Sequence, residues 1–128
     1  MNDELIYSYS RAQALADGVL IDVTEYAKQV GFKFPVAVTD SAWIDCCEWT
    51  EHDTQGLGQS TQGRLMDVLT MAALSAKSKA VDGDRVRFKV ARIARGGDTH
   101  AETIELLAHI GPGDDPSPVI TIGFSSDF

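Results

Sequence analysis

The chain has 128 residues, of which 44% are hydrophobic and 23% charged, a composition typical of a single globular domain. Its formal net charge of −8 argues against general nucleic-acid binding, because contacts to phosphates need clustered lysine and arginine. No apolar run approaches the roughly 20 residues that span a bilayer, and the N-terminus lacks a signal-peptide pattern, so we expect a cytoplasmic protein without membrane contact.

The first forty residues predict two short helices alternating with two short strands. Ser10 and Gln13 form a capping-box pattern, and Gly18 stands where the first helix would stop. Thr24 is predicted to cap the second helix, which Gly31 would end. The predicted elements are helices over 11–17 and 25–30 and strands over 19–23 and 34–39.

Two further helices are predicted in the middle of the chain. One begins near Asp40 and continues to about Trp49, and the polar, turn-rich loop 50–60 follows it. A long amphipathic helix over 61–79 comes next. Seven of its apolar residues fall in one arc of about 160°, which is typical of a core-facing stripe. The arc comprises Leu65, Met66, Val68, Leu69, Ala72, Ala73 and Ala76.

Three strands are predicted at the C-terminal end, over 85–93, 103–110 and 119–124. Turn-rich connections join them, which favours an antiparallel meander packed under the long helix. The connection "GPGDD" is not a phosphate loop, because its proline removes a donor and its aspartates repel phosphate. We therefore predict a single α+β domain over residues 1–128.

The segment "WIDCCEWTEHD" (43–53) concentrates side chains that are common in catalytic and metal sites. On a helical wheel, Cys46 and Cys47 lie with the two tryptophans, whereas Asp45 and Glu48 lie on the opposite side. Adjacent cysteines converge poorly on a metal, and an acidic neighbourhood raises a thiol pKa. Adjacent cysteines are also unsuited to a disulfide scaffold. We therefore expect buried, unreactive thiols, carboxylates that face water, and no metal or cofactor.

Two surfaces are candidate contacts for a partner protein or a second copy of the chain. The first is a group of carboxylates in and after the third helix. The second is a stripe on the long helix, opposite its core-facing arc. The alternative is that the 50–60 loop covers this stripe. The candidate residues are Asp45, Glu48, Glu51 and Asp53 in the first surface, and Arg64, Asp67, Met71 and Leu74 in the second.

A basic strip on the strand 85–93 is the candidate nucleic-acid contact. Residues 61–95 have a net charge of +5, whereas residues 1–60 have −7 and residues 96–128 have −6. An exposed basic strand can follow a phosphate backbone, but no aromatic residue alternates with these bases. Pairing with Glu102 and Glu105 on the neighbouring strand is therefore favoured. The strip comprises Arg85, Arg87, Lys89, Arg92 and Arg95.

Several motifs occur in order along the chain: "SRAQALADGVLIDVTEYAKQVGFKFPVAVT", W-x-D-C-x-x-W, "GRLMDVL" and "HIGPGDD-x-x-PVITI". In this order they resemble a family of small uncharacterised bacterial proteins, typically encoded on plasmids, integrative elements and prophages. The resemblance implies no established activity. Met66 departs from the family pattern, in which a tryptophan is common.

The leading hypothesis is a non-enzymatic accessory protein of a mobile element that acts by contact with an unidentified protein. The absence of a clear catalytic motif and the segregated charge motivate it. One version is an acidic inhibitor that mimics DNA. The alternatives are a nucleic-acid-binding module that uses the basic strip, and a small enzyme in which Cys46, Cys47 or His109 works with carboxylates.

Overall fold

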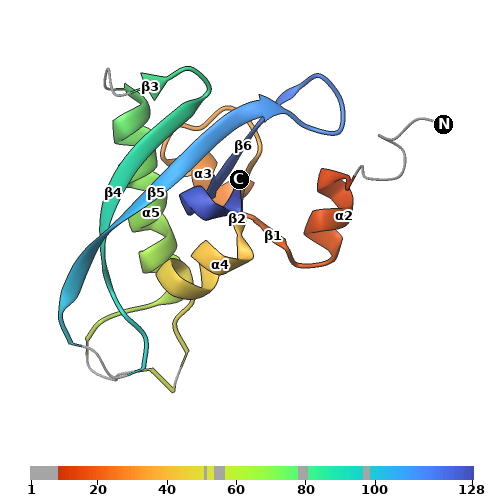
Figure 1. Cartoon of the computed structure of the whole chain (residues 1–128). Helices are drawn as coiled ribbons and strands as arrows, with labels where there is room; N and C mark the ends of the chain where they lie inside the picture. The colour runs from red at the N-terminus through yellow and green to blue at the C-terminus, as the bar shows by residue number, and fades with distance from the viewer. Residues whose placement is uncertain (1–8, 51, 54–56, 78–80, 97–98) are drawn as a thin grey trace.

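The computed structural model describes residues 9–50, 52–53, 57–77, 81–96 and 99–128 (Figure 1). They form a mixed α+β fold on an open six-stranded sheet with the order β1-β2-β6-β5-β4-β3. The strands are β1 Leu20–Asp22, β2 Val36–Thr39, β3 Val81–Asp82, β4 Arg85–Ile93, β5 Ala101–Pro112 and β6 Pro118–Gly123. The helices are α2 Arg11–Ala16, α3 Thr24–Gln29, α4 Asp40–Ala42, the π-helix η1 Trp43–Cys47, α5 Thr61–Lys77 and the 3₁₀-helix η2 Ser125–Asp127.

The predicted C-terminal meander is present as β4, β5 and β6, which are antiparallel neighbours. Phe88 lies opposite Leu106, and Ala108 lies opposite Ile122, so apolar residues of adjacent strands share the core face. The turn between β5 and β6 is closed by the Gly113 N–H, which donates to the Ser117 carbonyl at 3.0 Å. Strand β5 is longer than predicted at both ends.

The two short N-terminal strands extend this meander into a larger sheet. Strand β2 pairs in parallel with β6, and β1 pairs with β2 in the antiparallel direction. All four β2 residues are buried, as expected for an interior strand that is covered on both faces. The predicted architecture treated these strands separately from the meander, because their pairing depends on contacts between distant parts of the chain.

Helix α5 packs along β4 and covers one face of the sheet (Figure 1). Leu65, Val68, Leu69 and Ala72 are buried in a core that also contains Phe88 and Val90. The predicted core-facing arc is therefore largely confirmed, except that Ala76 is exposed near the end of the helix. Within the described ranges, no helix combines the length and apolar character needed to cross a membrane.

The helix termini near the N-terminus match the sequence signals in part. The Ser10 hydroxyl accepts a 3.0 Å hydrogen bond from the Gln13 N–H, and Gly18 has φ +76° after α2. Thr24 is not the cap of α3, as predicted, but its first residue. The N-cap residue is Val23, which makes no side-chain cap bond. The Asp22 carboxylate accepts from the Thr24 N–H at 3.0 Å, while the Thr24 hydroxyl accepts from the Val36 N–H at 3.1 Å. Thr24 thereby connects the start of α3 to β2.

The predicted third helix is wrong beyond its first turn. After α4, residues Trp43–Cys47 form a π-helix, in which the Glu48 N–H donates to the Trp43 carbonyl at 2.8 Å. Glu48 then adopts an extended conformation and ends the helix before Trp49. The wider π turn still places Cys46 and Cys47 in the core beside Ala42. Isolated π turns frequently occur at functional sites.

Candidate functional site

The acidic surface and the basic strip predicted as separate contacts meet in the folded chain. Arg92 Nε lies 3.1 Å from Asp45 Oδ2. Arg95 lies 3.1 Å from a Glu48 carboxylate oxygen and 3.0 Å from an Asp53 carboxylate oxygen. We call these five residues the arginine–carboxylate cluster. At these positions the predicted acidic surface and the predicted basic strip therefore form one mixed-charge cluster, in which both arginines are paired with carboxylates.

Asp53 is the buried member of the cluster, with a relative exposure of 7%, whereas it was predicted to face water. Its carboxylate accepts from the Thr50 N–H at 2.8 Å, from the Gly96 N–H at 3.2 Å and from Arg95. The Thr50 N–H is the main cause that lowers the pKa of this carboxyl, and Arg95 lowers it further. Asp53 therefore ties the loop after η1 to the end of β4. Glu51, also predicted at this surface, lies outside the described residues.

Arg64 was predicted on an outward stripe of the long helix, but it is only 3% exposed. Its guanidinium donates to the Ile93 carbonyl at 2.8 Å and to the Asp45 carbonyl at 3.1 Å, and it lies 4.9 Å from the centre of the Trp49 ring. The prediction failed because a wheel gives the direction of a side chain but not its length. A long guanidinium reaches the carbonyl groups that the π turn and the end of β4 present to α5.

Arg64 is a buried charge without a carboxylate partner among the described residues. Its remaining acceptor is the Gln59 side chain, at 3.2 Å. Burial lowers the pKa of its guanidinium, as desolvation does for any cation. Such a group is costly unless its hydrogen bonds are satisfied, which makes its surroundings a candidate functional site.

The two thiols are buried as predicted, with Cys46 2% and Cys47 0% exposed, while both tryptophans are half-buried. Burial raises the pKa of Cys46, and nearby Asp45 raises it further. Burial also raises the pKa of Cys47 to about 12. A nucleophilic cysteine needs the opposite shift, because only the thiolate reacts. Cys46 lines a different cavity from those that His109 lines, so these two candidate side chains do not share one site.

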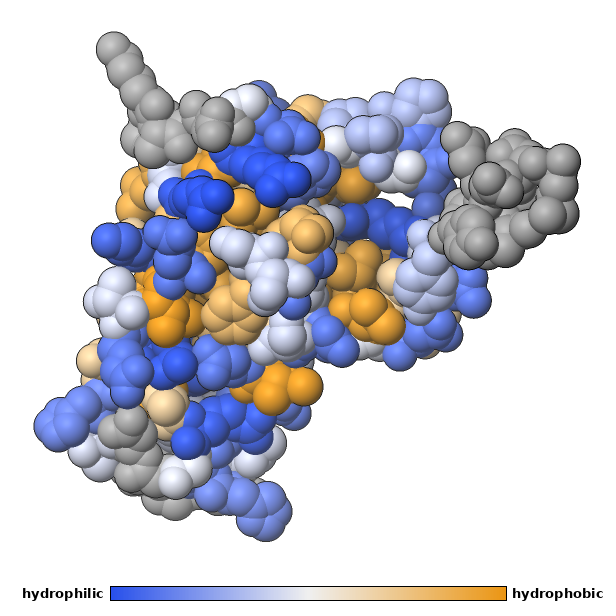
Figure 2. Space-filling model, in the orientation of Figure 1, coloured by the Kyte–Doolittle hydropathy of each residue, from blue (hydrophilic) through white to orange (hydrophobic). Residues whose placement is uncertain are grey.

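The rest of the basic strip is exposed on the outer face of the sheet. Arg85, Arg87 and Lys89 alternate along β4 with the buried core residues of that strand. Arg87 lies 3.5 Å from Glu105, which confirms the predicted cross-strand pairing. The face seen in Figure 2 mixes hydrophilic and hydrophobic residues without one dominant apolar patch. Arg85 lies 3.8 Å from an Asp84 carboxylate oxygen, so two of these three exposed bases are paired. They are a small surface for a phosphate backbone.

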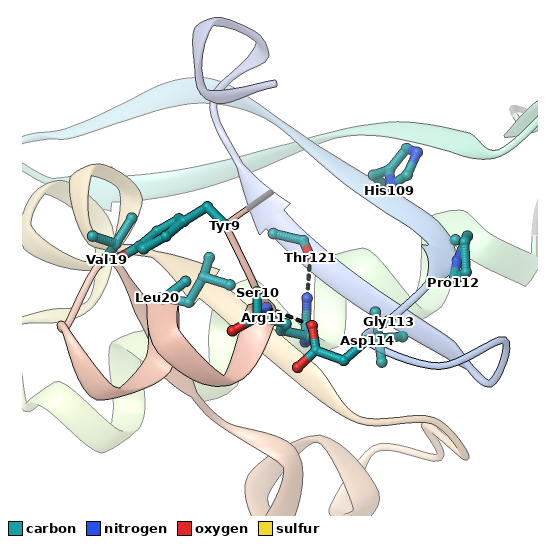
Figure 3. Close-up of a pocket in the computed structure, with 13 residues that line it drawn as sticks. Tyr9, Ser10, Arg11, Val19, Leu20, His109, Pro112, Gly113, Asp114 and Thr121 are labelled. Carbon is teal, nitrogen blue, oxygen red and sulfur yellow. Dashed lines mark hydrogen bonds between the residues drawn. The ribbon is translucent and has the colours of Figure 1, made fainter. Parts of the chain in front are cut away.

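A cavity of about 370 Å³ lies between α2 and the β5–β6 hairpin (Figure 3). Arg11 donates from its guanidinium to the Thr121 hydroxyl at 2.7 Å and from its backbone N–H to Asp114 at 2.6 Å. The second Asp114 oxygen accepts from the Ala12 N–H at 3.0 Å, and these two backbone N–H groups lower the pKa of Asp114. In Figure 3, His109 stands apart from this network. The polar groups are paired with each other, so they hold α2 against the hairpin.

A predominantly apolar groove runs beside the C-terminal half of α5. It consists of two cavities of about 200 and 190 Å³, and both are lined by Phe32 and Ala76. We call it the α5 groove. On the outer surface of the same helix, Asp67 is exposed, Met71 is 37% exposed and Leu74 is 56% exposed, as predicted for the outward stripe. The groove itself was not predicted, because it depends on how Phe32 packs against a distant helix.

No group of three or more histidine, cysteine, aspartate or glutamate side chains within the described parts of the chain could hold a metal ion. His109 lies 3.0 Å from an Asp84 carboxylate oxygen, and its ring centre is 6.0 Å from that of Phe128. A histidine oriented by a carboxylate is one half of a general-base arrangement. No described nucleophile is bonded to it, so this pair does not by itself define a reaction.

The sequence matches a known family over residues 1–127, and the chain belongs to it: a family of unknown function (DUF6573). Searches of curated proteins and of solved structures gave no significant match. The family match agrees with the motif resemblance in assigning no established activity.

Proposed function

We propose that the protein is a non-enzymatic accessory protein of a mobile genetic element that binds another protein through the α5 groove. The observation that carries this proposal is a predominantly apolar groove beside α5, together with two exposed apolar side chains, Met71 and Leu74, on the same helix. Surfaces of this kind commonly mark protein-binding sites.

The groove exists because α5 presents small side chains where larger ones would fill the space. Ala73 and Ala76 line one wall, Phe32 lines the other, and Val86 and Ile120 contribute to the floor. An apolar side chain inserted there would be removed from water at about 25 cal/mol per Å² of buried apolar surface. The groove therefore suits a partner that presents one or two aliphatic or aromatic side chains.

The apolar surface is wider than a small ligand would need. Leu74 follows Ala73 by one residue, about 100° around the helix, and Met71 precedes Leu74 by about one turn. Both side chains are exposed outside the two cavities. A protein can cover the groove and these neighbours together, which supports a protein partner.

The structure gives less support to the acidic DNA mimic than to a contact through apolar side chains. Asp45, Glu48 and Asp53 are paired with arginines, so they do not extend an acidic face of the kind a DNA mimic presents. The net charge of −8 still favours association with a basic protein, mainly through the rate of encounter. The proposal therefore rests on apolar contact.

The test is capture of a partner by the native protein and by two variants. Met71→Asp/Leu74→Asp places two charges on the exposed apolar side chains of α5, whereas Thr103→Asp places a charge on an exposed position of β5. We expect stoichiometric capture of a defined protein by the wild type and by Thr103→Asp, and loss of capture by the double variant. Retention of the partner by a folded double variant would contradict the proposal. Light scattering on the same samples shows whether the partner is a second copy.

A nucleic-acid module is the second candidate, and the exposed bases of β4 are the observation that favours it. Arg92 and Arg95 are held in the arginine–carboxylate cluster. The exposed bases that remain are Lys89 and two arginines in exposed ion pairs, Arg85 and Arg87. A gel-shift assay at low salt tests this candidate. A mobility change that Arg87→Ala/Lys89→Ala abolishes would make this candidate the better one.

A further inference from the structure

A small cavity of about 120 Å³ lies where the N-terminal half of α5 meets η1 and β4. Arg64 and Arg92 line it, together with Cys46, Gln59, Asp67 and Ala101. We call it the Arg64 pocket. It is open at its rim, because Asp67 and Ala101 are exposed, whereas Arg64 and Cys46 are buried. It shares no lining residue with the α5 groove.

Both arginines have a buried N–H group without a hydrogen-bond partner among the described residues. These groups are Arg64 Nε and Arg92 Nη1. A Glu102 carboxylate oxygen lies 3.9 Å from Arg92 Nη1, which is beyond hydrogen-bond range. Buried donors are paired in the great majority of proteins, and an unpaired one is costly. Two such donors from separate elements therefore point to a missing acceptor.

We propose that the Arg64 pocket binds one small oxyanion, either inorganic phosphate or a carboxylate group. The planar guanidinium, with its several N–H donors, matches the oxygen atoms of such anions. The pocket has room for about four water molecules, which suits one small anion. It is well below the roughly 300 Å³ at which sites for drug-sized ligands begin, so a nucleotide does not fit.

The other charges around the pocket set the expected strength. Asp45 is paired with Arg92, which partly neutralises its charge, and it also accepts a hydrogen bond from the Cys46 thiol. Arg95 adds positive charge nearby, since it lowers the pKa of Arg64. Asp67 on the exposed rim repels an anion, and solvent screens this repulsion. We therefore expect weak binding, with a dissociation constant on the order of 1 mM.

The test is titration of the intact chain with sodium phosphate and, separately, with sodium acetate, at constant ionic strength maintained with chloride. Calorimetry and the shift of the unfolding temperature give two readouts. We expect saturable binding that Arg92→Gln weakens about tenfold, because one charged hydrogen-bond donor is lost. Asp67→Asn should strengthen it about twofold, because a screened repulsion is removed. The matched control, Arg85→Gln, changes an exposed arginine on the same strand and should have no effect.

The outcomes divide clearly. Saturation by acetate but not by phosphate identifies a carboxylate as the ligand, and the reverse identifies phosphate. The proposal is overturned if neither anion gives saturable binding to the wild type. It is also overturned if Arg92→Gln and Asp67→Asn both bind the anion with the affinity of the wild type. Water is then the occupant of the pocket. Met71→Asp/Leu74→Asp should bind the anion normally, so this result is independent of the proposed protein contact.

Discussion

Replacement of Arg64 by methionine tests whether this side chain holds three elements together. The substitution keeps an unbranched chain of similar length on α5 and removes every donor. The Ile93 and Asp45 carbonyls then lose bonds of 2.8 and 3.1 Å, and the contact with the Trp49 ring loses its charge. The end of β4 and the π turn would be linked to α5 by packing alone.

The change in the free energy of unfolding caused by Arg64→Met is the difference between opposing effects. Each carbonyl that loses its buried partner costs about 1–3 kcal/mol, and loss of the cation–π contact costs about 1 kcal/mol. Removal of a buried charge without a carboxylate partner offsets part of this loss. We expect the free energy of unfolding to fall by about 3 kcal/mol. For Arg64→Lys, the free energy of unfolding should fall by less, because an ammonium group can still reach one of the carbonyls.

Urea denaturation, followed by the fluorescence of Trp43 and Trp49, measures this effect. Arg87→Met is the control, because Arg87 is exposed, and it should change the unfolding free energy by less than about 0.5 kcal/mol. If Arg64→Met is as stable as the control, with an unchanged slope against urea, water satisfies the two carbonyls. The assigned structural role of Arg64 would then be wrong.

Three further predictions concern other parts of the chain. Gly123→Ala should lower the melting temperature, because its Cβ would lie 2.7 Å from Thr39 Cγ2; an unchanged melting temperature would show that Thr39 can move aside. The lowered pKa of Asp53 stabilises the fold above its unfolded-state value of about 4, and this contribution is lost as pH falls through the folded pKa. Asp53→Asn should therefore be less stable at pH 7 and lose less stability on acidification, and parallel pH profiles would contradict this. Cys46 and Cys47 should resist thiol reagents at pH 8 until urea unfolds the chain, so fast labelling of the native protein would count against their burial.

Elements with a strong local period were predicted well. The alternation in β4 and the apolar arc of α5 are visible in the sequence because each side chain's face depends on its own position in the element. The π turn was not visible, because one additional residue in a turn leaves no mark in a pattern of apolar residues. The sheet order also escaped prediction, although the run "VAV" in β2 is apolar enough to indicate an interior strand.

The candidate sites also divide into features set by local sequence patterns and features set by tertiary contacts. The sequence by itself determined the class of fold, the burial of Cys46 and Cys47, and the exposure of Met71 and Leu74, because these follow from local periodicity and composition. Only the tertiary structure decided which charges meet. It brings Asp45, Glu48 and Asp53 to Arg92 and Arg95, buries Arg64 between three elements, and opens the α5 groove. The physical reason is that charge pairing and cavity shape depend on distances between residues that are remote in the sequence, which no local pattern specifies.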